Sequence, residues 1–431
     1  MTHSLIGVLD AEDFDAFDVL FEQASAIGRT AKGGLHRLAA STEDGAARDL
    51  LCDWLSSQGL EVRIDQVGNL FGLAELTPGA PYLMCGSHLD SQPTAGRFDG
   101  AYGVVAGALA IARLARAWCA AGTRPRFNLA LVNWTNEEGA RFQPSLIGSS
   151  VFTGSLTAEQ AWACRDRDGI SLGEALHRIG YRGDAPVTLS CAGYVEIHAE
   201  QGVALERSNA DVGVVRRTWA ALKLLVEFEG AQAHTGPTPM AERRDALLAA
   251  AQAIVLVREL ADAYPGRLHS SVGRLEVYPN SPNVVPAKAQ AFVEFRSEEP
   301  ELLQVIQTRF ESALAEIAAA TGTRLHLPQR QLREALPMHE GLATLAHAAC
   351  AELGATALDC TTVSGHDAIS LARVAPSLLL FVPSQGGIAH HEAEFTSAEQ
   401  MHTGLAVLTR VLARAAEGEG VLSDIQPGTE R

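Results

Sequence analysis

The chain has 431 residues, of which 47% are hydrophobic and 20% charged, a composition that excludes disordered and fibrous proteins. This length, roughly three times that of a typical domain, predicts two domains. The 34 basic and 51 acidic residues give a net charge of −17, which disfavours nucleic acids and anionic membranes as main partners. Since no apolar run approaches the roughly 20 residues that a membrane helix needs, we expect no membrane span.

The cysteines and the N-terminal segment indicate a cellular compartment. The seven cysteines are scattered and include no CxxC pair, a pattern that is typical of reduced thiols. The segment MTHSLIGVLDAEDFDAF has neither the basic start nor the apolar centre of a signal peptide. We therefore expect a cytoplasmic protein.

The first third of the chain alternates between helical and extended patterns. Apolar residues at helical spacing predict a helix over 45–58, followed by extended chain over 61–73. A short apolar strand over 82–88 precedes an Ala-rich helix over 101–118 and a further strand over 126–134. Strands that alternate with helices at this spacing predict a parallel α/β sheet.

The middle of the chain follows another pattern, in which strand, helix, strand, strand, helix and strand succeed one another. The predicted ranges are 217–229, 241–263, 267–278, 287–297, 299–320 and 323–331. This β-α-β-β-α-β order is that of a ferredoxin-like domain. We therefore predict an inserted domain over 214–330, which divides the parallel-sheet domain into residues 1–213 and 331–431.

The first cluster of polar residues is GSHLDSQPTAGRFDG, residues 86–100. His88 ends an apolar strand, at the carboxyl edge where open α/β sheets bind their ligands. Asp90 is placed to hold the His88 imidazole in one tautomer. Asp99 precedes the helix at 101 in a Gly-rich loop, where it either faces a site or only caps that helix.

A pair of glutamates follows the next predicted strand. Glu137 and Glu138 of NWTNEEGARF again lie at a carboxyl end. Adjacent carboxylates repel each other and are costly without a cation nearby. One of them can bind a metal while the other acts as a general base. The alternative is a solvated acidic turn, which is common in an acidic protein.

Histidines accompany two further strands. His198 lies inside the alternating strand YVEIHAEQG, where a single histidine is more often a core residue than a ligand. His390 and His391 follow an apolar strand and a Gly-rich loop in LLLFVPSQGGIAHHEAEF. Three histidines and two or three carboxylates suit divalent metals such as Zn²⁺, Mn²⁺, Co²⁺ or Ni²⁺. With one bridging Asp they suffice for two ions about 3.5–4 Å apart, a site that activates water for hydrolysis.

The motifs also resemble a known family in their order along the chain. They are GSHLDS with FDG, NEEGARF, HAEQG, GAQAH with TPM and DAL, PNSPNVVP, and GHDA with FVPS and GGIAH. Together they resemble the amidase, hydantoinase/carbamoylase family, which includes N-carbamoyl-L-amino-acid hydrolases, β-ureidopropionases and allantoate amidohydrolases. This family lies within the superfamily of dinuclear-metal aminoacylases and carboxypeptidases.

The resemblance implies a role for each matching position. The implied metal ligands are His88, Asp99, Glu138, His198 and His390, with Asp99 bridging two divalent ions. Glu137 is the implied general base, and Asp90 orients His88. The implied substrate-binding residues are Gln201 and, in the inserted domain, His234, Asn283 and Arg296. An Arg fork can hold a substrate carboxylate, and a His or Asn donor can stabilise an oxyanion. Without the family pattern, Arg296 reads as an ordinary surface charge.

Two segments leave alternatives open. His391 stands where the family has a small polar residue, so either His390 or His391 is the ligand. His366 and Asp367 of GHDA either support the site, face the substrate or serve in packing.

The resemblance implies a mostly parallel α/β metallohydrolase with a ferredoxin-like lid and dimerisation domain. It would hydrolyse the ureido C–N bond of N-carbamoyl-L-amino acids to amino acid, CO₂ and ammonia. Allantoate amidohydrolase and β-ureidopropionase are the nearest alternatives, and an aminoacylase or dipeptidase of the superfamily is a more distant one. A scaffold without metal is disfavoured because every expected ligand is present. The implied partners are a small ureido-carboxylate substrate and a second copy of the chain, with His234 acting in its own or the partner's active site.

Overall fold

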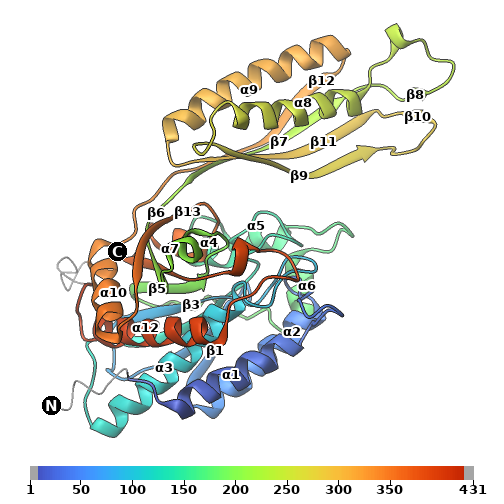
Figure 1. Cartoon of the computed structure of the whole chain (residues 1–431). Helices are drawn as coiled ribbons and strands as arrows, with labels where there is room; N and C mark the ends of the chain where they lie inside the picture. Colours follow the sequence, from blue (N-terminus) through green and yellow to red (C-terminus); the bar gives the residue numbers. More distant parts are fainter. Residues whose placement is uncertain (1–7, 422–431) are drawn as a thin grey trace. The chain divides into compact units, whose positions relative to one another are not determined.

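The computed structural model describes residues 8–421, and the chain divides into two compact units (Figure 1). Unit 1 comprises Met1–Arg216, Pro337–Cys360 and Ser364–Arg431, and unit 2 comprises Arg217–Leu336 with Thr361–Val363. The role of unit 2 as a lid and dimerisation domain stays a prediction.

Unit 1 is built on an eight-stranded sheet in the order β1-β2-β4-β3-β5-β14-β6-β13. The central strands are β4 (Asn128–Trp134), β3 (Tyr82–His88), β5 (Cys191–Ala199) and β14 (Ser377–Val382), and neighbours among them run parallel. The outer strands are β1 (Glu61–Ile64), β2 (Leu70–Ala74), β6 (Val212–Thr218) and β13 (Ala357–Thr362). Three outer pairings, β1 with β2, β2 with β4 and β6 with β14, are antiparallel.

The α/β prediction is confirmed, with the difference that the sheet is mixed around a parallel centre. The antiparallel edge arises where the predicted extended stretch 61–73 folds back on itself. Asp65 makes the turn, because its Oδ1 accepts the backbone N–H groups of Val67 and Asn69, each at 2.9 Å. Gly68, with a φ of 85°, supplies the left-handed backbone that this turn requires.

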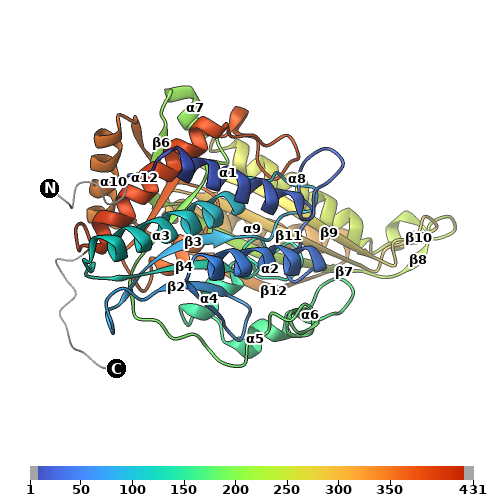
Figure 2. The ribbon, with the colours of Figure 1, turned by 90° about the horizontal axis from the view of Figure 1, so that it is seen from below.

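The parallel strands are buried on both faces, as strands between two layers of helices must be. Alternate residues of β3 and β14 enter two hydrophobic clusters, with Leu83 and Leu380 on one face and Met84 and Phe381 on the other. Helices α3 (Ala101–Ala121), α12 (Ala398–Ala416) and α1 (Ala11–Ala26) cover the first face, as Figure 2 shows from below. Helices α4 (Ile147–Phe152), α7 (Ala204–Ser208) and α11 (Asp367–Leu371) contribute to the second cluster.

The expectation that no segment is apolar enough to span a membrane is wrong for helix α3. Among the described residues it is the one helix that passes such a test by length and composition. However, 61% of its most apolar window is buried inside the protein. An ideal Cβ at Gly103 would lie 2.2 Å from the Ile197 carbonyl oxygen, so the helix packs directly on β5. A helix that is apolar on nearly all sides is therefore the core helix of unit 1.

Side-chain caps set where several helices of unit 1 begin. Asp10, Ser41, Thr157, Ser171 and Ser397 each accept the backbone N–H of the residue three positions further on. The remaining helices of this unit are α2 (Thr42–Ser57), α5 (Ala158–Ala163), α6 (Leu172–Arg178), α10 (Glu340–Leu353) and the short 3₁₀ helix η3 (Gln385–Gly387). Because Ser41 caps α2, this helix begins three residues before the predicted position 45.

Unit 2 has the predicted β-α-β-β-α-β order of elements. These are β7 (Ala220–Glu229), α8 (Ala246–Asp262), β9 (His269–Tyr278), β11 (Lys288–Ser297), α9 (Pro300–Thr321) and β12 (Arg324–Arg333). The strands form an antiparallel sheet in the order β12-β7-β11-β9, and both helices pack on one face of it. The short strand β8 (Ala233–His234) and the 3₁₀ helix η2 (Met240–Glu242) lie between β7 and α8. The short strand β10 (Val284–Val285), which pairs with β8, lies between β9 and β11.

Candidate active site

Polar side chains gather where the parallel strands of unit 1 end. His88 is the last residue of β3, and Glu137 and Glu138 follow β4. His198 is the last residue but one of β5, and His390 follows β14 after a Gly-rich turn. Because parallel strands end at the same edge of a sheet, the fold brings these five side chains together.

Asp99 lies at the centre of this cluster. Its Oδ1 is 3.0 Å from His198 Nε2 and 3.6 Å from His88 Nε2. Its Oδ2 is 3.3 Å from His390 Nε2 and accepts a hydrogen bond of 3.0 Å from Gln201 Nε2. Although burial opposes the charged form of Asp99, the neighbouring His198 and His390 outweigh it and hold its pKa well below the usual value. Its side chain does not cap α3, whose N-cap is Gly100.

Two sets of possible metal-binding atoms share Asp99. His88, Asp99 and His198 form the first set, and Asp99, Glu138 and His390 form the second. Within each set, the candidate ligand atoms all lie within 4.8 Å of one another. Three imidazoles and two carboxylates, one of them common to both sets, are a suitable donor set for two divalent ions.

The electrostatics of the cluster also fit bound cations. Burial, with the negative charges of Asp367 and Glu138, raises the pKa of Glu137 well above its usual value. Burial and the charge of Asp99 raise the pKa of Glu138 to about 8. Carboxylates this close together and this far from water are costly unless positive charge compensates them. Divalent cations would supply that charge, so the residues present fit a metal centre.

The two buried histidines are held so that Nε2 can act as a ligand. His88 Nδ1–H donates to the backbone carbonyl of Asp90 at 2.9 Å, and His198 Nδ1–H donates to that of Ala199 at 2.8 Å. A carbonyl oxygen only accepts, so each ring, when neutral, has its lone pair on Nε2, on the side of Asp99. Although burial lowers the pKa of His198, the hydrogen bond and charge of Asp99 raise it to about 9, so His198 would bind a metal ion after losing its Nε2 proton. Burial lowers the pKa of His88 to about 4, which keeps its ring neutral at pH 7.

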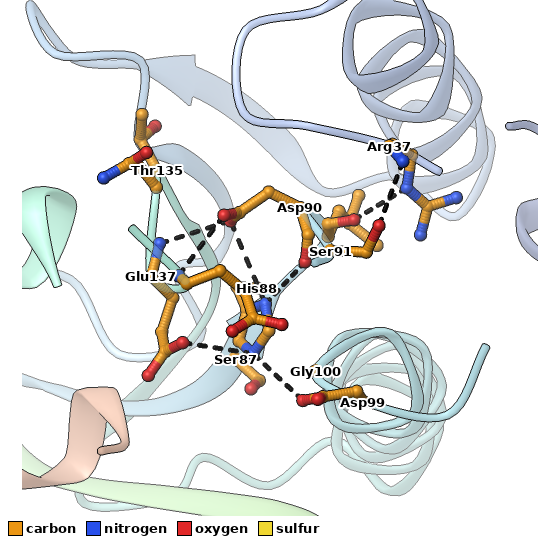
Figure 3. Close-up of polar contacts among 12 residues, drawn as sticks. Arg37, Ser87, His88, Asp90, Ser91, Asp99, Gly100, Thr135 and Glu137 are labelled. Atoms are coloured by element: carbon orange, nitrogen blue, oxygen red, sulfur yellow. Dashed lines mark hydrogen bonds and ion pairs between the residues drawn. The ribbon is translucent and has the colours of Figure 1, made fainter. Parts of the chain in front are cut away.

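Asp90 orients His88 through its backbone, whereas we expected its carboxylate to do so. Its Oδ1 lies 3.9 Å from His88 Nδ1, too far for a hydrogen bond. The carboxylate instead accepts the backbone N–H groups of Glu137 at 3.2 Å and Glu138 at 3.3 Å (Figure 3). Asp90 therefore holds both the His88 ring and the backbone of the glutamate pair.

The structure distinguishes the two adjacent histidines. His390 adopts a left-handed φ of 53°, and its Nε2 reaches both Asp99 and Glu138, the latter at 3.5 Å. His391 instead accepts the backbone N–H of Ala393 through Nδ1 at 3.0 Å, a local turn contact. Of the two, it is His390 that the fold brings into the cluster.

The other predicted substrate-binding residues belong to unit 2 and are described there. His234 is exposed on β8, where it pairs with Val284, and Thr235 N–H donates to the Asn283 carbonyl at 3.2 Å. Arg296 lies near the end of β11, where its Nη1 donates to the Val363 carbonyl at 2.6 Å and its Nη2 to Glu294 at 2.8 Å. Within unit 2, His234 and Asn283 thus lie together, while Arg296 lies towards the other end of β11.

Sequence reasoning missed one buried carboxylate of the cluster. Glu394 is 5% exposed and accepts the backbone N–H groups of Phe98 at 3.2 Å and Asp99 at 3.3 Å. Burial and the charge of Asp99 raise its pKa to about 8. The signal that could have revealed it is its spacing, four residues after His390 in a segment that already carried a candidate ligand.

The GHDA segment lies directly behind His198. The ring of His366 packs edge-on against that of His198, with 4.7 Å between the ring centroids. Ala368 N–H donates to Glu196 Oε2 at 2.8 Å, and Glu196 Oε1 accepts a hydrogen bond of 2.8 Å from Ser87 Oγ. This segment therefore supports a residue of the cluster, one of the alternatives left open above.

Comparisons with known proteins agree with this geometry. Residues 84–414 match the peptidase family M20/M25/M40. The N-carbamoyl-L-amino-acid amidohydrolase of Rhizobium meliloti is 35% identical over 404 residues, which cover 93% of this chain and 96% of that protein. The allantoate amidohydrolase of Bacillus subtilis is 33% identical over 399 residues, with 92% and 96% covered.

A solved structure shows the same overall fold. The crystal structure of an amidase of the hydantoinase/carbamoylase family from Burkholderia vietnamiensis matches with a TM-score of 0.89 and 36% sequence identity. The match covers 95% of this chain and 99% of that one. Similarity therefore extends over nearly the whole chain in both sequence and structure.

We expect Gly100→Ala to displace His88 and so to weaken metal binding. Gly100 has a φ of 65°, and an ideal Cβ there would lie 2.4 Å from the His88 ring. Gly122, with a φ of 63° and no atom within 4 Å of such a Cβ, is a matched control for backbone strain alone. Backbone strain should cost both variants about 1–2 kcal/mol of stability in thermal unfolding, and the collision with His88 should add to the loss in Gly100→Ala. Only Gly100→Ala should contain less metal per chain after dialysis against Zn²⁺, and equal metal contents would contradict the expectation.

Proposed function

The chain belongs to the peptidase family M20/M25/M40 and is an amidohydrolase of the hydantoinase/carbamoylase group, and from this premise we propose that its substrates are N-carbamoyl-L-amino acids. It would hydrolyse their ureido C–N bond and release amino acid, CO₂ and ammonia. The observation that carries the proposal is the position of Asp99 between two sets of possible metal ligands. The similarity to N-carbamoyl-L-amino-acid amidohydrolase supports the substrate class.

The proposed ligands of two divalent ions are His88, Asp99, Glu138, His198 and His390, with Asp99 shared. Their imidazole and carboxylate donors suit Zn²⁺, Mn²⁺, Co²⁺ or Ni²⁺. When bound, the ions would polarise the ureido carbonyl and lower the pKa of water. The Nδ1–H bonds of His88 and His198 hold both rings in the orientation that such ligands need.

Glu137 is the proposed general base. Its Oε2 lies 3.6 Å from His88 Nε2, so its carboxylate faces the same space as the proposed ligands. Its raised pKa suits a group that first accepts a proton and then gives it up. Glu137 would take the proton of the attacking water and deliver it to the departing nitrogen. Ammonia then leaves, and the carbamate of the amino acid decomposes to CO₂ and the free amino acid.

The proposed substrate-binding residues are Gln201 of unit 1 and His234, Asn283 and Arg296 of unit 2. Arg296 would hold the substrate carboxylate through its guanidinium fork. His234 and Asn283 offer donors for the oxyanion, and Gln201 lies beside Asp99 in unit 1. We propose further that the protein forms a homodimer through unit 2. We also propose that it is cytoplasmic, since its seven cysteines are free thiols.

Allantoate is a second candidate substrate, favoured by the 33% identity to allantoate amidohydrolase. The cluster itself does not separate the two, because both substrates present a ureido carbonyl to the same atoms.

The experiment that tests the substrate is ammonia release by the Zn²⁺- or Mn²⁺-reconstituted protein. The compounds are N-carbamoyl-L-methionine, its D-enantiomer, N-carbamoyl-β-alanine, allantoate and N-acetyl-L-methionine, with free methionine followed for the last. Preference for the L-carbamoyl compound is the expected result. Preference for allantoate would keep the mechanism and change the substrate, and no turnover with two ions bound would contradict the substrate class.

Glu137→Gln should keep metal and substrate binding but lose about 10²–10⁴-fold in kcat, because the amide cannot accept the proton. Glu159→Gln is the control, since Glu159 is exposed on α5 and should leave kcat unchanged. Bound metal per chain and steady-state kinetics are the measurements. Wild-type turnover in Glu137→Gln would remove Glu137 from the role of base.

Arg296→Ala should raise KM for carboxylate-bearing substrates by about 10- to 100-fold, since a charge-assisted hydrogen-bond pair is lost. The control is Arg274→Ala on the neighbouring strand β9, where Arg274 pairs with Glu276 at 3.0 Å. Initial rates over a range of substrate concentrations separate KM from kcat. An unchanged KM in Arg296→Ala would refute the carboxylate-binding role.

A further inference from the structure

Asp90 is the residue through which three functional groups of the cluster are held. Its carbonyl accepts His88 Nδ1–H, and its carboxylate accepts the backbone N–H groups of Glu137 and Glu138. A shift of the Asp90 backbone would therefore move the imidazole and both glutamates together. The contacts of the neighbouring residues determine where this backbone lies.

Arg37 holds the backbone on both sides of Asp90, as Figure 3 shows in part. Before it, Arg37 Nε donates to the Leu89 carbonyl at 2.6 Å. After it, Arg37 N–H donates to Ser91 Oγ at 2.9 Å, and Ser91 N–H donates to the Arg37 carbonyl at 2.8 Å. The Arg37 side chain thus holds the residue before Asp90, and the Arg37 backbone holds the residue after it through one donated and one accepted hydrogen bond.

Arg37 is itself rigidly placed. It is 0% exposed, and its Nη1 donates to the Ala24 carbonyl at 2.7 Å and the Ile27 carbonyl at 3.1 Å, at the end of α1. A buried guanidinium with several carbonyl acceptors loses little further freedom when it forms them. It therefore transmits the position of α1 to the 89–91 backbone.

The buried charges around Arg37 are balanced. Asp44 pairs with Arg48 at 2.9 Å, both side chains being 0% exposed, and Arg48 Nη2 donates to Thr135 Oγ1 at 3.3 Å. Thr135 lies two residues before Glu137. Burial lowers the pKa of Arg37, and the carboxylates of Asp44 and Asp90 oppose this effect, as Arg48 opposes the raised pKa of Asp90. An unmatched charge would be costly in this buried region.

We propose that Arg37 is a positioning residue for the catalytic centre, which acts through Asp90 on His88, Glu137 and Glu138. The Arg37 side chain donates to the Leu89, Ala24 and Ile27 carbonyls, and none of these residues is a proposed metal ligand. The inference rests on the metal centre of the proposed function, and it assigns a role to a residue some 50 positions before the nearest motif of the cluster. A role in packing alone would lower stability without changing the ligand geometry.

The test compares Arg37→Met with Arg113→Met in the full chain. Arg113 Nε donates to Asp13 at 2.9 Å and so ties α3 to α1. Its hydrogen-bond partners are Asp13 and Val8, away from residues 88–91, and its side chain is 26% exposed, so Arg113→Met controls for the loss of an arginine contact to α1. Metal-free protein is titrated with Co²⁺ and followed by visible absorption, with chelator competition for the Kd. Thermal unfolding of the metal-free forms reports stability separately.

We expect Arg37→Met to raise the Kd for Co²⁺ by about 10- to 100-fold and to change the absorption bands, as loss of a residue that supports ligands does. Arg113→Met should leave both within about threefold of wild type, whatever its loss of stability. Arg37→Lys should restore part of the affinity, because a lysine can reach one carbonyl but lacks the planar fork that reaches several.

Unchanged Co²⁺ affinity and spectrum in folded Arg37→Met would overturn the proposal, and so would an equal weakening in Arg113→Met. If Arg37→Met does not fold, Arg37→Lys decides by the same measurement, since it keeps the positive charge but loses the fork that reaches the Leu89, Ala24 and Ile27 carbonyls. Weaker Co²⁺ binding in Arg37→Lys than in the wild type supports the proposal, and wild-type binding overturns it. Failure of the wild-type protein to bind two Co²⁺ ions would instead refute the proposed metal centre, and this inference with it.

Discussion

The structure of unit 1 depends on the burial of like charges at one edge of its sheet. Asp99 is 3% exposed and lies among three histidines, while Glu137 and Glu394 lie close by and are buried too. Removing several carboxylates from water costs more free energy than their hydrogen bonds return. The same atoms form two sets that could hold divalent cations, whose positive charge would offset this cost.

The surrounding backbone holds four of the buried side chains in and around this cluster. Carbonyl groups hold the Nδ1 side of His88 and His198, and backbone N–H groups hold the carboxylates of Asp90 and Glu394. Gly100 leaves room for the His88 ring, where any Cβ would collide with it. Main-chain groups are the most rigid partners that a fold offers, so the side chains keep their geometry in a region of high charge.

Much of this arrangement follows from sequence patterns, and the limits have physical reasons. The strand over 82–88 and the β-α-β-β-α-β order of unit 2 agree with the structure because apolar periodicity and strand length are local properties. The hairpin at 61–74 was not foreseen, since its turn depends on the side chain of Asp65 accepting two backbone N–H groups. The apolar length of α3 was likewise underestimated, and only its packing shows it to be a core helix.

The sequence by itself determined which residues could form the cluster, because His88, Glu137, Glu138 and His198 lie in or directly after strands whose ends must meet. Only the tertiary structure decided between His390 and His391, which differ in backbone conformation at the end of one loop. It alone revealed Glu394 and Arg37, whose partners lie far away along the chain. The physical reason is that hydrogen bonds between distant segments leave no periodic signal in the chain, whereas burial of an apolar face does.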